Sequence, residues 1–277
     1  MLVPETKWLM KAIFRSGFLA LAIMALAVPA NTGPYEDGLA AYRRGDYATA
    51  LKFWRPLAEQ GDAEAQYNLG SMYDQGNGVP QDIAEAAKWW LLAAAQDFAN
   101  AQNNLGNLFA DGRGVPQDDA EAAKWWLMAA EQGHARAKFN LGVMYRDGRG
   151  VPQDDAEAVK WFRKAAEQGD ADGQALLGFL YEIGLGVPQE DAEAVRWYRM
   201  AAEQGDATAQ YNLGVMYANG QGVPQDDATA HMWFTLAAAQ GDEEAQKNRD
   251  IAASLMTPDQ IAEAQRMARE WMAQHQQ

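Results

Sequence analysis

The chain has 277 residues, is 48% hydrophobic and contains only 10 prolines, which excludes wholesale disorder and leaves enough apolar residues for a core. Its net charge of −15 disfavours nucleic acid and anionic membrane surfaces as partners, because both are bound through basic surfaces. The absence of cysteine excludes disulfides, a thiol nucleophile, a cysteine-based zinc site and a lipid-bearing cysteine. Alanine is abundant, and since it is the strongest helix former we expect an all-α protein.

The N-terminal residues 1–30 have the composition of a secretory signal peptide. Lys7, Lys11 and Arg15 precede an uncharged run over residues 17–28, which is shorter than the roughly 20 residues that cross a bilayer. Cleavage is expected after Ala30 or after Ala27, with no stable membrane insertion afterwards. The protein is thus predicted to be exported, with the periplasm as the expected location. Secretion, or anchoring by an uncleaved segment, are the alternatives.

Residues 35–62 are predicted to form a helical N-terminal cap. The segment "AYRRGDYATALKFW" has a Tyr–Trp spacing of 12 residues, from Tyr42 to Trp54, where the unit that follows has 17, from Tyr73 to Trp90. A shorter connection between two helices accounts for the difference.

Residues 63–242 consist of one unit repeated five times. A proline and a tryptophan each recur every 36 residues, at Pro80, Pro116, Pro152, Pro188 and Pro224 and at Trp89, Trp125, Trp161, Trp197 and Trp233. A period this regular predicts a tandem array of supersecondary units. The units are residues 63–98, 99–134, 135–170, 171–206 and 207–242.

Each unit carries two helical patterns. In the first unit, Ala65, Leu69 and Tyr73 recur at helical spacing, and Ala86 and Trp90 do the same after a turn rich in glycine and proline. The segment "DGRGVPQDDAEA", which occurs twice word for word, spans that turn. Two antiparallel helices per unit are therefore predicted.

Helix-boundary residues agree with this reading. Asp118, followed by Glu121, is typical of a capping box, and Gly133 stands where a left-handed residue closes the second helix. Gly142 lies inside a first helix, where glycine costs about 1 kcal/mol relative to alanine, so a close approach by a neighbouring helix is expected there. The aromatic pair of the second helix is predicted to fill that space.

Residues 243–277 are predicted to form a C-terminal helical cap. After the start of one more first helix, "TPDQ" at residues 257–260 opens a long amphipathic helix that ends near His275. Such a helix would cover the last unit.

The pattern A-x-A-Q-x-N-L-G-x-M-Y, followed by G-x-G-V-P-Q-D and A-E-A-x-K-W-W-x-x-A-A, resembles the Sel-1-like repeat family, longer-looped relatives of the tetratricopeptide repeat. The match runs from Ala63 to Asp242 in one register. The resemblance implies a right-handed α-solenoid of helix-turn-helix repeats whose first helices line a concave surface, and a role in assembling protein complexes. Residues 35–62 look like a tetratricopeptide-like cap.

The sequence contains no strong motif for catalysis, phosphate binding or metal binding. The glycine loop follows a helix and lacks the lysine of a phosphate-binding loop, and it has Gly, Arg and Pro where a calcium loop needs oxygen ligands. The three histidines and three serines fall in no nucleophile motif, and His134 stands where other units have Asp. We therefore predict no catalytic residue, cofactor or metal, although a carboxylate pair assembled across repeats remains open.

The candidate partner-binding residues lie on the face of the first helices opposite the predicted core. Exposed aromatic rings there are typical anchors, although packing between repeats is an alternative. The recurring asparagines would hold a partner's backbone or link neighbouring repeats, and we favour the second interpretation. In the fourth unit, apolar residues replace polar ones, which indicates an interaction site. The predicted set is Tyr67, Asn68, Asn103, Asn104, Phe139, Asn140, Arg146, Leu176, Phe179, Ile183, Leu185, Tyr211 and Asn212.

The sequence predicts an exported, non-catalytic scaffold or adaptor that binds other proteins on its concave helical surface. Two alternatives stay open. One is a cell-envelope enzyme or a peptidoglycan- or β-lactam-binding protein, since some cysteine-rich relatives have been linked to such ligands; the lack of cysteine here counts against it. The other is a periplasmic regulator that binds a membrane sensor.

Overall fold

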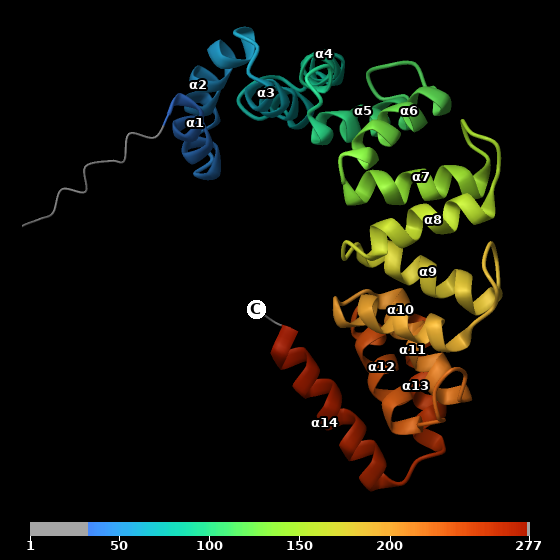
Figure 1. Ribbon diagram of the computed structural model, residues 1–277. Helices are drawn as coiled ribbons and strands as arrows, with labels where there is room; N and C mark the ends of the chain where they lie inside the picture. Colours follow the sequence, from blue (N-terminus) through green and yellow to red (C-terminus); the bar gives the residue numbers. More distant parts are fainter. Residues whose placement is uncertain (1–32, 276–277) are drawn as a thin grey trace, which may run out of the picture.

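The computed structural model describes residues 33–275, and the predicted signal peptide lies outside them. The described residues form fourteen α-helices and no strand, so the predicted all-α solenoid is confirmed. Figure 1 shows the helices stacked one after another along an arc, with α1 and α2 at one end and α13 and α14 at the other. No described helix is long and apolar enough to cross a membrane.

The helices alternate between a first and a second helix of each unit. The first helices are α1 (Pro34–Arg43), α3 (Ala63–Gln75), α5 (Ala99–Asp111), α7 (Ala135–Asp147), α9 (Ala171–Ile183), α11 (Ala207–Asn219) and α13 (Glu243–Ser254). The second helices are α2 (Tyr47–Glu59), α4 (Ile83–Ala94), α6 (Asp119–Glu131), α8 (Asp155–Ala166), α10 (Asp191–Glu203) and α12 (Asp227–Ala239), and α14 (Pro258–His275) ends the chain. From α1 to α13, each helix packs against the next one along the chain.

The second helices begin at the predicted caps, but the capping box is only half formed. The Asp118 side chain accepts the backbone N–H of Glu121 at 2.9 Å, as a cap should. The Glu121 carboxylate instead binds Lys124, and the backbone N–H of Asp118 donates to the carbonyl of Phe109 at 2.9 Å. The reciprocal bond was therefore predicted wrongly, because the preceding helix takes the N–H group first.

Backbone conformation and a close backbone contact explain the two glycines of the repeated loop. Gly148 ends α7 in the left-handed conformation, with φ of 66°. Gly150, also at φ 66°, lies against the backbone of Asp119 at the start of the preceding second helix, where a Cβ would clash. Arg149, between the two glycines, pairs with the Asp119 carboxylate at 2.8 Å. The loop therefore joins neighbouring units.

The predicted close approach inside each unit is confirmed. A glycine of the first helix faces the second aromatic residue of the pair on the following helix: Gly70 with Trp90, Gly106 with Trp126, Gly142 with Phe162, Gly178 with Tyr198 and Gly214 with Phe234. The aromatic residues of these pairs are all buried. This contact fixes the distance between the two helices of a unit.

A ladder of buried glutamines links successive units. Gln102 is fully buried, accepts a hydrogen bond from Gln132 at 2.7 Å, and donates to the carbonyl of Ala94 in the preceding unit at 3.3 Å. Gln66, Gln174 and Gln210 make the equivalent pairs of bonds. Lys138 interrupts the ladder and donates to Gln168 at 2.8 Å. The ladder satisfies carbonyls at the C-terminal ends of second helices.

The last two helices depart from the repeat. α14 packs against α12, and Trp271 meets Trp233 edge-on with ring centroids 6.4 Å apart. In α13, Arg249 and Asp250 stand where α11 has Leu213 and Gly214, and a side chain at the glycine position excludes the aromatic contact that joins the helices of a unit. α14 therefore packs on the preceding second helix instead of on α13.

Candidate functional site

A groove of about 530 Å³ lies over α7, α9 and α11, and we call it the central groove. Its lining includes five of the predicted partner-binding residues: Phe139, Arg146, Leu176, Phe179 and Asn212. The groove exists because first helices of successive units pack chiefly on the second helices between them, which leaves space between neighbouring first helices.

Phe179 and Ile183 of α9 are exposed at this face, with 42% and 49% of their surface accessible. Leu176 and Leu185 are half-buried, because both pack against the core cluster that Leu177 and Leu180 form with neighbouring helices. Of the four apolar residues that distinguish the fourth unit, Leu176 and Leu185 therefore cover the core, whereas Phe179 and Ile183 face solvent.

The charges in the central groove are predominantly acidic. Asp172 pairs with Arg136, and Arg146 pairs with Asp147 at 2.7 Å, so these four groups neutralise each other. Glu182 also lines the groove and accepts a hydrogen bond from the Tyr198 hydroxyl at 2.6 Å. Burial, reinforced by Glu182, raises the pKa of Tyr198, so this tyrosine stays neutral.

Asp206 is the remaining carboxylate of the central groove, and it caps α11 by accepting the Ala209 N–H at 2.7 Å. Burial raises its pKa, and the carboxylate of Asp172 raises it further. Among residues 33–275, neither Glu182 nor Asp206 forms an ion pair. The groove therefore carries two half-buried negative charges that no protein cation neutralises.

The asparagine row serves neighbouring repeats at two of its positions. Asn68 donates to the Tyr35 hydroxyl at 2.9 Å, and Asn140 donates to the Asn107 side chain at 3.3 Å; both bonds join first helices of successive units. Asn103 is buried, with 7% of its surface exposed, whereas Asn104 is half-buried. Asn212 differs from Asn68 and Asn140 in lining the central groove.

The predicted aromatic anchors pack against other rings. Tyr67 meets Phe98, the last residue of its own unit and the N-cap of α5, at 5.1 Å between ring centroids. Phe139 meets Phe162 at 5.6 Å, and Tyr211 meets Phe234 at 5.9 Å, both within their own units. All three are half-buried. They hold helices together and at the same time keep part of their surface accessible to solvent.

A second groove, which sequence reasoning missed, lies between α11 and α13 and has a volume of about 360 Å³. Tyr211, Val215 and Phe234 line it together with Ile251 and Leu255, and the last two are 59% and 68% exposed. We call it the terminal groove. The signal was present in the sequence, since Ile251 and Leu255 stand two repeats after Phe179 and Ile183 in the 36-residue register.

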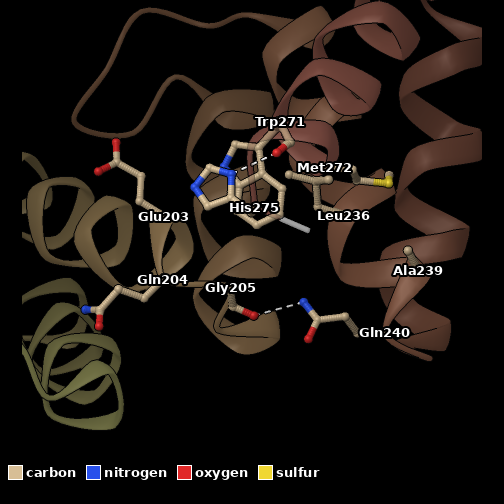
Figure 2. Close-up of a pocket in the computed structure, with 9 residues that line it drawn as sticks. All are labelled: Glu203, Gln204, Gly205, Leu236, Ala239, Gln240, Trp271, Met272 and His275. Atoms are coloured by element: carbon tan, nitrogen blue, oxygen red, sulfur yellow. Dashed lines mark hydrogen bonds between the residues drawn. The ribbon is translucent and has the colours of Figure 1, made fainter. Parts of the chain in front are cut away.

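A pocket of about 380 Å³ lies where α14 meets the ends of α10 and α12 (Figure 2). His275 stacks on Trp271 at 3.9 Å between ring centroids, and Gln240 donates to the carbonyl of Gly205 at 2.9 Å. The first contact lies within α14, and the second joins the last two complete units. α14 itself packs against α12, and the pocket lies beside that contact.

The second helices of the first two complete units carry another apolar patch that the sequence reading missed. Leu91 and Leu92 of α4 and Leu127 and Met128 of α6 are 38% to 50% exposed. The equivalent positions of α8 are Arg163 and Lys164, which ends the patch. Among the described residues, no cluster of three or more His, Cys, Asp or Glu could hold a metal ion.

Comparison with known proteins assigns the repeat. The family model described as Sel1 repeat matches residues 20–62, 63–98, 99–134, 135–170, 171–206 and 207–242. No curated protein matches the chain.

Two solved structures are similar along most of the chain. A protective antigen of uropathogenic Escherichia coli strains, described as displaying an SLR fold, is 38% identical with a TM-score of 0.78; the match covers 86% of this chain and 53% of that one. This chain thus spans about half the length of that protein. A Sel1 repeat protein from Oxalobacter formigenes is 37% identical with a TM-score of 0.72, over 77% and 88% of the two chains. The chain therefore belongs to the Sel1 repeat family, whose repeats generally mediate protein–protein interactions.

Proposed function

We propose that the protein is an exported, non-catalytic adaptor that binds a partner protein in the central groove. The observation that carries the proposal is the exposed ring of Phe179 beside two carboxylates, Glu182 and Asp206, that have no ion-pair partner. A solvent-exposed aromatic residue in a groove is a typical interface anchor, and unpaired charges beside it supply specificity.

The fourth unit differs from the first two at the position of Phe179. There the first two units have Ser71 and Asn107, whose polar groups are used within the protein. Ser71 donates to the Tyr67 carbonyl at 3.0 Å, and Asn107 accepts from Trp126 at 3.1 Å. A large ring at this position is therefore no requirement of the repeat, which supports a binding role.

Export is supported by the composition of residues 1–30, with basic residues ahead of a short apolar run. Fractionation of cells that express the full chain tests it. A shortened chain recovered from the periplasm or the medium agrees with export. A full-length chain that stays in the cytoplasm contradicts it.

Site-specific photo-crosslinking tests the binding site. A photoreactive phenylalanine analogue placed at Phe179 is expected to capture a discrete partner in the envelope fraction. The same analogue at Lys160 is the matched control, because this residue is exposed on α8 of the preceding unit, away from the central groove.

A third position tests the competing surface. The analogue at Leu92, which is 50% exposed on α4, reports on the apolar patch of the second helices. Capture of a partner at Leu92 but not at Phe179 would indicate that the partner binds to the apolar patch and not in the central groove. No capture at either position would contradict the adaptor function.

A further inference from the structure

Two exposed apolar pairs occupy the same register on first helices two units apart. Phe179 and Ile183 lie on α9, and Ile251 and Leu255 lie at α13 and its C-terminal cap, 72 residues later. Val215, the equivalent of Phe179 in the unit between them, lines the terminal groove. We call Phe179, Val215 and Ile251 the anchor row. It connects the central groove to the terminal groove across α11.

The register at which first helices of the complete units receive the aromatic ring of their second helix is polar in α13. The face of α13 that would hold a following second helix carries Arg249 and Asp250, which pair with each other at 2.7 Å. That face thus lacks the glycine that receives an aromatic ring in the complete units. The apolar residues lie instead on the face that continues the anchor row.

Carboxylates line both grooves along this row. Asp227, at the start of α12, lines the terminal groove and, like Glu182 and Asp206, forms no ion pair among residues 33–275. Arg146, which lines the central groove, and Arg249 of α13 are each paired with the adjacent aspartate. A partner with positive charge between its apolar anchors would complement these three carboxylates.

On the basis of the proposed function, we propose that the central and terminal grooves bind one extended segment of the partner, which inserts an apolar side chain into each groove and carries Lys or Arg between them. Packed helices lie about 8–10 Å apart and neighbouring first helices at least that far, so anchors two units apart are separated by roughly 20 Å or more. An extended chain needs about six residues or more to cover that distance.

A phage-displayed library of random 16-residue peptides, selected on the full chain, tests the segment's chemistry. The enriched peptides are expected to share two apolar positions separated by at least about five residues, with Lys or Arg between them. Enrichment of acidic peptides, of peptides with a single apolar position, or of none overturns the inference.

Affinities of an enriched peptide, measured by fluorescence anisotropy, test simultaneous use of both grooves. Phe179→Ala and Ile251→Ser are each expected to weaken binding about tenfold or more, whereas Leu92→Ser, the matched exposed control, leaves it unchanged. Glu182→Gln is expected to weaken binding severalfold and to reduce its salt dependence. Leu255→Ser replaces Ile251→Ser if the latter fails to fold, as judged by circular dichroism.

The results separate this inference from the proposed function. If the partner is still captured through Phe179 while Ile251→Ser and Leu255→Ser leave capture and peptide affinity unchanged, the adaptor function stands and the two-groove inference is wrong. If Phe179 captures nothing and no peptide is enriched, both fail.

Discussion

The ring of Phe162 occupies the space that a side chain at Gly142 would need, since a Cβ built on Gly142 would lie 2.5 Å from Cε1 of the ring. Glycine is unfavourable inside a helix by about 1 kcal/mol relative to alanine, yet here it allows α7 and α8 to pack through a fully buried aromatic residue. The same contact recurs in all five complete units. It is the packing unit from which the solenoid is built.

Two glycine-to-alanine substitutions should therefore have opposite effects. Gly142→Ala is expected to lower the free energy of unfolding by about 1–2 kcal/mol, because overpacking outweighs the gain in helix propensity. Gly173→Ala is expected to raise it by about 0.5–1 kcal/mol, since Ala137 and Ala209 occupy this register in the adjacent units and a Cβ would be no closer than 3.2 Å to any neighbour. Urea unfolding measures both. An equal effect of the two substitutions would contradict the packing argument.

Lys138 interrupts the glutamine ladder, and Lys138→Gln should repair it. Burial lowers the pKa of Lys138, and the nearby Lys164 lowers it further, so the charged form is less favoured in the folded protein than in the unfolded chain. A glutamine would accept from Gln168 and donate to the Ala130 carbonyl, as Gln102 does with its partners one unit earlier. The expected gain is about 1 kcal/mol in urea unfolding. Lys160→Gln, on the exposed face of α8, is the control and should change stability by less than about 0.5 kcal/mol.

His134 caps α7 by accepting the backbone N–H of Ala137 at its Nδ1 atom, 3.2 Å away. Burial lowers its pKa below the ordinary 6.5, so the unfolded chain takes up the proton first as pH falls. The stability that this neutral cap contributes is complete above about pH 6.5 and declines as pH falls towards the lowered pKa.

Substitutions at His134 test this linkage. His134→Ala should cost about 1 kcal/mol at pH 7.5 and less at pH 5.5. His134→Asp restores the aspartate cap of other units. Between pH 7.5 and pH 5.5, its free energy of unfolding should fall by less than that of the parent chain. His231, whose pKa burial also lowers, is common to all three proteins and cancels in the comparison. A parallel pH dependence of parent and His134→Asp would exclude His134 as the source.

Trp271 holds the C-terminal cap, since α14 contacts the array through Trp271, Met267 and Met272 around the buried Ala268. Trp271→Ala should therefore speed amide hydrogen exchange in α14 by tenfold or more, with smaller changes in α12 and none in α3 to α6, because repeat arrays couple only neighbouring units. The exposed Gln274→Ala serves as the control. Faster exchange throughout the array would instead indicate global unfolding.

Local structure was predictable because each unit signals its own helix ends. Asp118 and Asp154 cap second helices, and Gly148 closes a first helix, as short-range hydrogen bonding requires. The half-formed capping box was not predictable, because the competitor for the Asp118 N–H is the carbonyl of Phe109, which only the folded loop brings close. The glutamine ladder repeats as regularly as the asparagine row, but its hydrogen bonds join residues 30 apart in sequence.

For the candidate site, the sequence singled out the fourth unit. Leu176 and Phe179 do line the central groove, and Ile183 is exposed one helical turn after Phe179 on α9. Their exposure could not be predicted, since it depends on which neighbouring helix covers each side chain: Leu176 packs on the core, and Phe179 faces solvent.

By itself, the sequence determined the helices, their boundaries, the 36-residue unit and the family, because caps, glycines and hydrophobic spacing act over a few residues and are copied with each unit. Only the tertiary structure decided that first helices leave grooves between them and that α14 packs on α12 instead of α13. The anchor row from Phe179 to Ile251 likewise depends on packing between units, where side chains far apart in sequence compete for the same space.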